Sequence, residues 1–188
     1  YIQMQRILKK QIVCLPASIA SGATSYSCTA NAWSLNSIAL SQISEVTYYL
    51  GGREYNSTTH YGTTEEVYAW ERGTTVYSGR PTNWTGLVGL MYPSDYAYTF
   101  ANGVDDTCYT DTYNCSSGSS SWLYKSGTYH WTVSPGSGDA GSVFHVSFAY
   151  YGRVSNSNTS NRNGVRPVVY LKSDIKLQGN GTYGSPYE

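Results

Sequence analysis

The stretch from Tyr129 to Lys172 constrains the fold more than any other part of this chain. Near its centre, Phe144, Val146 and Phe148 alternate with polar or small residues. A period of two is typical of a β-strand with one buried face. The segments between the apolar pieces consist almost wholly of Ser, Gly, Asn, Tyr and Ala, which are residue types that antibody paratopes use for contact. The stretch therefore predicts a rigid β-frame that displays a binding surface.

A last strand is predicted in the text GVRPVVYLKSDIKL, residues 164–177. Pro167 removes one amide from its hydrogen-bond ladder, so we expect it at a sheet edge or at the start of the strand. Arg166 is flanked by Val and Pro, and we expect it to be at least half buried beside a carboxylate or carbonyl partner. Its predicted role is to hold this strand in place, and contact with a ligand is the alternative.

Two helices are predicted upstream. The first runs from Ser34 to Leu50, because Ser34 can cap it, apolar residues recur on one face, and Gly51-Gly52 supplies a left-handed stop. The second runs from Thr64 to Arg72 and starts with the capping-box pair Thr63 and Glu66.

After the second helix the pattern changes to short strands. Strands are predicted over Thr74–Tyr77 and Leu87–Tyr92, with a turn at Pro93–Asp95. Helices followed by many short strands with long loops predict an α+β fold. The 188 residues are expected to form one domain.

The N-terminal segment, residues 1–30, is open to two interpretations. Tyr1 to Val13 has apolar residues at helical spacing, but a short strand fits as well. The chain does not begin with Met and shows no signal peptide, so we expect that it starts at a cut. On the helical interpretation, this segment is the remnant of an upstream anchoring helix.

Four cysteines form two local pairs, Cys14 with Cys28 and Cys108 with Cys115. Neither pair has the CxxC spacing of a metal site, and the histidines lie far from them, so zinc is not expected. We predict two disulfides and hence an oxidised, exported location, although four cysteines allow three connectivities and reduced buried thiols are the alternative.

The loop around the second cysteine pair is rich in carboxylates. Asp105, Asp106 and Asp111 could supply some of the oxygen ligands that calcium prefers. There is no EF-hand spacing, however, and Asp is common in turns for local reasons. Calcium in this loop stays an open alternative, and the prediction carries no metal.

The charge balance argues against several partners. The 12 basic and 12 acidic residues cancel to a formal net charge of zero. Proteins that bind nucleic acids or anionic membranes carry an excess of basic residues. No apolar run approaches the length of about 20 residues that a membrane span needs. Tyrosine is in excess, with 20 residues against 3 Phe, which indicates amphipathic rings at the surface.

Catalysis and cofactor binding are not expected. No G-x-S-x-G elbow and no phosphate-binding glycine loop occurs, and the histidines have no catalytic signature around them. We interpret His130 and His145 as contact residues. The predicted ligand-binding residues are those expected to point outward or to lie in loops: His130, Ser137, Asp139, Ser142, His145, Ser147, Tyr150, Tyr151, Arg153, Ser155, Asn156, Asn158 and Asn161.

Several motifs carry a resemblance to known families. WTVSP (Trp131–Pro135), VFHV (Val143–Val146) and NGVRPVVYLKS (Asn163–Ser173) resemble the end of C-type-lectin-fold variable proteins, which are diversified by diversity-generating retroelements and share the formylglycine-generating-enzyme-like fold. WERGTTVYSGRPTNWTGLVGLMYPSDYAY (Trp70–Tyr98) resembles the heads of prepilin-like surface proteins of gut Firmicutes and their phages.

The resemblance implies a single C-type lectin-like domain with two helices packed on short mixed or antiparallel strands. It implies a variable region over residues 129–164, with Trp131, Gly164, Val165 and Arg166 as fixed scaffold. The sugar-binding triplets of calcium-dependent lectins are missing, as is the cysteine pair of the oxidase, so neither activity is implied.

The function implied is ligand recognition at a cell or phage surface, with no catalysis. The expected partner is a protein or a cell-surface glycoconjugate, and the resemblance also allows assembly into a surface filament. The alternative is a structural pilin-like subunit, whose loops serve only the packing between subunits.

Overall fold

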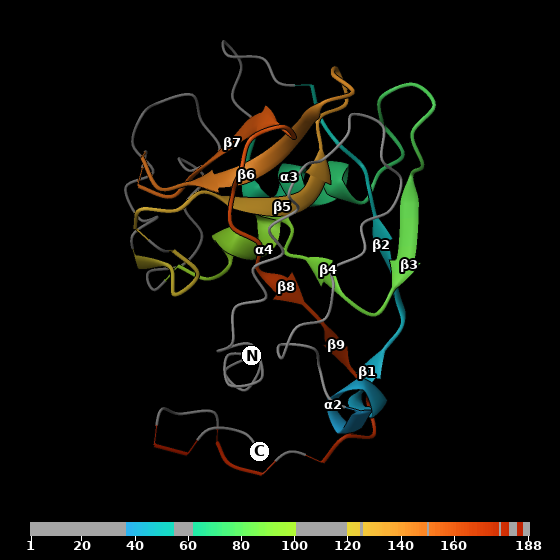
Figure 1. The fold of residues 1–188 in the computed structure, drawn as a ribbon, viewed down its shortest axis with the longest axis vertical. Coiled ribbons are helices and arrows are strands. Elements are labelled where there is room, and N and C mark those ends of the chain that lie inside the picture. Colours follow the sequence, from blue (N-terminus) through green and yellow to red (C-terminus); the bar gives the residue numbers. More distant parts are fainter. Residues whose placement is uncertain are drawn as a thin grey trace.

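The computed structural model describes residues 37–54, 62–100, 120–124, 126–149, 151–176, 178–180 and 184–185. This part of the chain is a mixed α+β structure with short helices and small antiparallel sheets (Figure 1). The predicted fold class is confirmed at this level. None of its helices is both long and apolar enough to cross a membrane.

The largest sheet has three antiparallel strands in the order β5-β6-β7. Val146 at its centre lies opposite His130 on one side and Val154 on the other. The register between the first two strands shifts between Trp131 and Pro135. The strands are β5 (His130–Pro135), β6 (Ser142–Ser147) and β7 (Arg153–Asn158).

The described residues also form three two-stranded antiparallel pairs. The pairs are β1 (Ile43–Ser44) with β9 (Tyr170–Leu171), β2 (Val46–Tyr49) with β3 (Asn83–Gly86), and β4 (Gly89–Leu90) with β8 (Pro167–Val168). The predicted last strand is thus two short pieces. Pro167 begins β8, and both strands of a two-stranded pair are edges, so its predicted edge position is confirmed.

Three helices are present in the described residues: α2 (Ser37–Gln42), α3 (Thr64–Glu71) and α4 (Pro93–Ala97). The predicted start of the second helix is confirmed, because Glu66 donates its backbone N–H to Thr63 Oγ1 at 3.3 Å. In return, Thr63 N donates to Glu66 Oε2 at 2.8 Å. This reciprocal pair satisfies two amides that the first helical turn leaves free.

The prediction of one helix from Ser34 to Leu50 is wrong beyond Gln42. The chain continues as β1 and β2 instead, with Tyr48 paired to Trp84. β-branched and aromatic residues dominate this part and fit a pleated surface. Pairing with β9 and β3 therefore outweighs the helical spacing of its apolar residues. Gly51 does not stop a helix; it approaches the Trp70 carbonyl so closely that a Cβ would collide with it.

Three smaller predictions are wrong wholly or in part. Thr74–Tyr77 is not a strand, and the strand predicted over Leu87–Tyr92 is limited to β4. The predicted turn at Pro93–Asp95 is the first turn of α4, where Pro93 needs no amide donor and Asp95 Oδ2 accepts from Tyr92 N at 3.0 Å.

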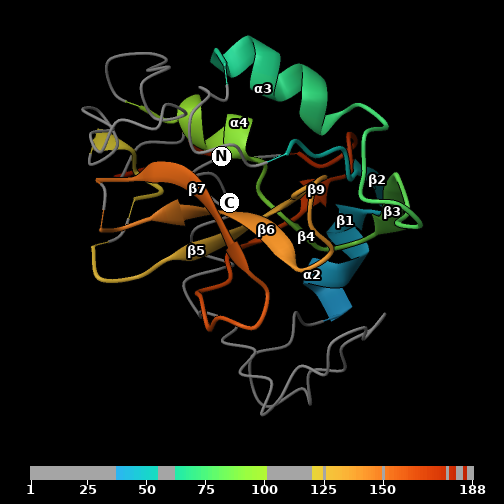
Figure 2. The ribbon, with the colours of Figure 1, turned by 90° about the horizontal axis from the view of Figure 1, so that it is seen from above.

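The hydrophobic core lies between α3, α4 and one face of the three-stranded sheet (Figure 2). Trp70 packs on Phe144, with ring centroids 5.3 Å apart. The buried residues of this core are Val67, Met91, Tyr96, Ala97, Phe100, Phe144, Val146 and Val154. The sheet is therefore a fixed platform, and its ends and connecting loops are what it can present.

Candidate ligand-binding site at the end of the sheet

The turn between β5 and β6 lies against the chain that follows β2. Ser137 N donates to Arg53 O at 3.1 Å, and Arg53 forms a parallel bridge with Gly136. Gly52 packs directly on the Pro135 carbonyl, where a Cβ would collide. These backbone contacts bring Glu54 to the end of the three-stranded sheet.

A pocket of about 190 Å³ opens at this end of the sheet. Its wall consists of backbone at two glycines and of four polar side chains. The lining residues are Glu54, Gly136, Gly138, Asp139, Ser142 and Asn156. The pocket thus joins the segment after β2, the β5–β6 turn and β7.

Local hydrogen bonds orient the side chains of the pocket. Asp139 Oδ1 accepts from Gly141 N at 2.9 Å, and Asn156 Nδ2 donates to Ser142 Oγ at 2.6 Å. A Cβ at Gly138 would lie 2.7 Å from Glu54 Cγ, so the glycine lets the Glu54 side chain lie against the turn. Both carboxylate groups belong to exposed residues.

Further predicted contact residues surround the pocket. Thr159 N donates to Gly141 O at 2.7 Å, which joins the end of β7 to the β5–β6 turn. Asn161 Nδ2 donates to Ser157 Oγ at 2.6 Å, and Ser160 N donates to Asn158 Oδ1 at 2.9 Å. The predicted contact residues at this end of the sheet are Ser137, Asp139, Ser142, Asn156, Asn158 and Asn161.

The prediction that alternate residues of these strands point outward is wrong for most of them. His145 and Ser147 are 6% and 0% exposed. The sheet is covered on both faces, because the segment between β7 and β8 crosses it on the side away from α3 and α4 (Figures 1 and 2). The predicted contact residues that are buried are His130, Ser142, His145, Ser147, Arg153 and Ser155.

His145 is packed among aromatic rings on the face opposite the core. Its ring centroid is 5.1 Å from that of Tyr129 and 5.9 Å from that of Trp131. Burial, with the charge of Arg153, lowers the pKa of His145 to about 4. A neutral imidazole in this environment is a packing residue of the sheet.

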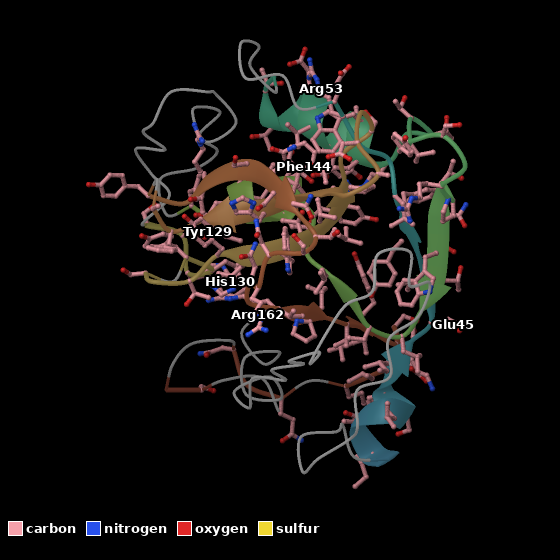
Figure 3. All side chains as sticks on the ribbon, turned by 45° about the horizontal axis from the view of Figure 1, so that its top comes forward. Glu45, Arg53, Tyr129, His130, Phe144 and Arg162 are labelled. Atoms are coloured by element: carbon pink, nitrogen blue, oxygen red, sulfur yellow. The ribbon has the colours of Figure 1, made fainter. Side chains whose placement is uncertain are left out.

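His130 lies on the core face, opposite Val146. Gly164 pairs with it through a parallel bridge, and Trp131 N donates to Gly164 O at 2.9 Å. Figure 3 shows Arg162, two residues before this bridge, near His130 at the same edge of the sheet. Gly164 therefore closes the edge of β5, which suits the fixed scaffold role that the resemblance implies for it.

Tyr151 lies at the opposite end of the sheet from the pocket, in the β6–β7 hairpin. It is 60% exposed and has a φ of 52°, and Gly152 follows at 91°. Left-handed backbone is uncommon for a residue with a Cβ. The structure thus separates Tyr151 from the pocket residues, and Tyr150 lies outside the described residues.

Sequence analysis missed three pocket residues, Gly136, Gly138 and Glu54, and of these Glu54 is the one with a polar side chain. It follows Gly51-Gly52 and lies far along the chain from Asp139. The only local signal is the pair of glycines, which mark a close approach of backbone to backbone. The partner in that approach, the Pro135 carbonyl, is not visible in the sequence.

Several other predictions lie on residues that the structure does not describe. These are the anchoring-helix hypothesis for residues 1–30, the two cysteine pairs and the calcium hypothesis for residues 105–111. In the described part, no three His, Cys, Asp or Glu side chains gather as a metal site. Arg166 is partly buried, as predicted, and burial lowers its pKa while the Tyr96 phenol raises it.

Comparison with protein families, with curated proteins and with solved structures found no match to this chain. What the chain does must therefore be inferred from its own residues. Within the described part of the chain, the pocket with its surrounding Ser and Asn side chains is the candidate binding site.

Proposed function

We propose that the chain is a ligand-binding domain of C-type lectin type, displayed at a cell or phage surface. It recognises a protein or a cell-surface glycoconjugate and catalyses no reaction. The observation that supports this proposal is the clustering of predicted contact residues around one pocket: Ser137, Asp139, Ser142, Asn156, Asn158 and Asn161. Loops held by a rigid frame are where binding residues concentrate.

The chemistry of this surface suits recognition. Ser and Asn side chains both donate and accept hydrogen bonds, so they adapt to different polar ligands. The frame beneath them is fixed by the core and by the Gly164 contact at the edge of β5. Binding therefore needs little ordering of the protein, which lowers the entropic cost of association.

The first test is deep sequencing of this gene across one bacterial or phage population. We expect substitutions at adenine-containing codons between Tyr129 and Asn163, with Trp131 and Gly164–Pro167 unchanged. Within that range, exposed pocket residues such as Asp139 should vary more than the buried ones. Sparse variation spread evenly along the gene would contradict the proposal.

One observation favours the alternative, a structural pilin-like subunit. Trp84 and Tyr170 are 46% and 43% exposed and both contact the Tyr48 ring, at centroid distances of 5.4 and 6.0 Å. Exposed aromatic rings of this kind also serve contacts between subunits. Sedimentation of the purified chain separates the two: concentration-dependent assembly that Trp84→Ser abolishes would favour the subunit.

A further inference from the structure

We infer that the pocket between Glu54 and the β5–β6 turn binds the ammonium group of a lysine side chain presented by a protein partner. This inference rests on the proposed recognition function and names the chemical class of group that the site takes. It follows from the charge, the free acceptor atoms and the size of the pocket.

The charge of the pocket comes from two carboxylates. Glu54 and Asp139 both line it, and among the described residues neither forms an ion pair with a basic side chain. A cation placed in a pocket that two carboxylates line is attracted by both of them. The pocket is thus electrostatically suited to a positively charged group.

The free atoms of the pocket are mainly hydrogen-bond acceptors. Asp139 Oδ1 accepts from Gly141 N, which leaves Oδ2 free to accept from a ligand. Asn156 Nδ2 donates to Ser142 Oγ, which fixes the amide and leaves its Oδ1 as an acceptor. With the Glu54 carboxylate, these atoms match an ammonium group, which has three donors and no acceptor.

The size and lining of the pocket limit further which cation can bind there. About 190 Å³ corresponds to roughly six water molecules at about 30 Å³ each, enough for a slim side chain. No lining residue is aromatic, whereas quaternary ammonium groups are recognised by aromatic cages. A primary ammonium on a flexible chain therefore fits this pocket better than a quaternary ammonium does.

The test is an NMR titration of the ¹⁵N-labelled chain with small probes. We expect N-acetyl-lysine methylamide to shift the amide signals of Gly138 and Gly141, and its uncharged analogue N-acetyl-norleucine methylamide to leave them unchanged. The lysine effect should weaken as salt rises. Equal shifts with both probes, no shift with either, or preferential binding of glucosamine or N-acetyl-arginine methylamide would overturn the inference.

Matched variants locate the effect. Glu54→Gln and Asp139→Asn should each weaken binding of the lysine probe at least tenfold. Glu45→Gln, an exposed residue that Figure 3 shows well away from Arg53 and hence from its neighbour Glu54, should not. If Glu45→Gln weakens binding of the lysine probe as much as the other two variants do, the proposed site is wrong. The melting temperatures of all three variants should equal that of the wild type, so that a change in affinity reflects binding and not folding.

The same variants distinguish this inference from the function on which it rests. If the wild-type chain binds host or neighbouring cells and Glu54→Gln binds them equally well, recognition stands and the lysine pocket is wrong. If the wild-type chain binds no cells but does bind the lysine probe, the pocket stands and surface recognition is wrong.

Discussion

Glu71 at the end of α3 accepts two hydrogen bonds from Ser94 in the first turn of α4. The donors are the Ser94 backbone N–H, at 2.8 Å, and its hydroxyl. The Glu71 side chain is completely buried and also accepts from Arg72 Nη1 at 3.0 Å. The Glu71 carboxylate, at the end of α3, therefore caps the N-terminus of α4. This contact fixes the two helices on which the sheet packs.

Removing this carboxylate should destabilise the fold strongly. Glu71→Ala leaves the Ser94 amide without its acceptor and opens a cavity in a buried site. We expect a loss of about 3–5 kcal/mol in the free energy of unfolding, because two buried hydrogen bonds are lost and a cavity remains. Urea denaturation measures it. Glu65→Gln, on the exposed side of the same helix, is the control and should change stability by less than about 0.5 kcal/mol.

Glu71 should also make stability depend on pH. Burial raises its pKa from 4.5 to about 7, so the native state binds more protons than the unfolded state between these values. This contribution is present in full below about pH 4.5 and is lost as pH rises to about 7. Urea midpoints of Glu71→Gln should lack this decline. An identical decline in wild type and variant would assign it to another group.

His145 should act in the opposite direction. Its pKa falls from 6.5 to about 4 on burial, so the unfolded state binds more protons in this range. Its contribution is present in full above about pH 6.5 and is lost as pH falls to about 4. His145→Gln should therefore be less sensitive to acid than wild type, as measured by urea unfolding at several pH values. Equal acid sensitivity would contradict the burial of a neutral imidazole.

Local patterns in the sequence predicted those elements whose stability is local. The capping box of α3 is satisfied within its own first turn by Thr63 and Glu66. The alternation around Phe144 correctly located β6, since the core side of a strand follows a period of two. Both signals lie within a few residues of the element they define.

The failures involve partners distant in sequence. Ile43 is in a strand because Leu171 pairs with it, and no pattern near Ile43 shows that pairing. His145 is buried because rings and a later segment cover the second face of the sheet, so alternation could not tell which face was open. Glu54 joined the candidate site through a contact between Gly52 and Pro135 that is likewise non-local.

The glycine contact that builds the pocket should be essential to it. At Gly52 a Cβ would collide with the Pro135 carbonyl oxygen, so Gly52→Ala must move the segment that carries Glu54 away from the turn. We expect the lysine probe to bind at least tenfold more weakly while the chain stays folded. The control is Gly184→Ala, because nothing lies within 4 Å of a Cβ at that position. Gly79→Ala would be a poor control, because the positive φ of Gly79 makes alanine strained there. Equal binding by wild type and Gly52→Ala would contradict the proposed pocket wall.

The fold should be less stable with Tyr at position 151 than with Asn there. Its left-handed φ of 52° is unfavourable for Tyr but acceptable for Asn, and its ring is mostly in solvent. Tyr151→Asn should raise the free energy of unfolding by about 0.5–1 kcal/mol. Tyr98→Asn removes a ring of similar exposure from a residue without positive φ, so it should bring no gain. A loss of stability in Tyr151→Asn larger than in Tyr98→Asn would show that the Tyr151 ring packs in a way that offsets its backbone strain.

The same variant also tests for binding at the hairpin. If Tyr151→Asn is more stable but binds its ligand less well, the Tyr151 ring is a contact residue. The hairpin end of the sheet is then a second recognition surface beside the pocket end.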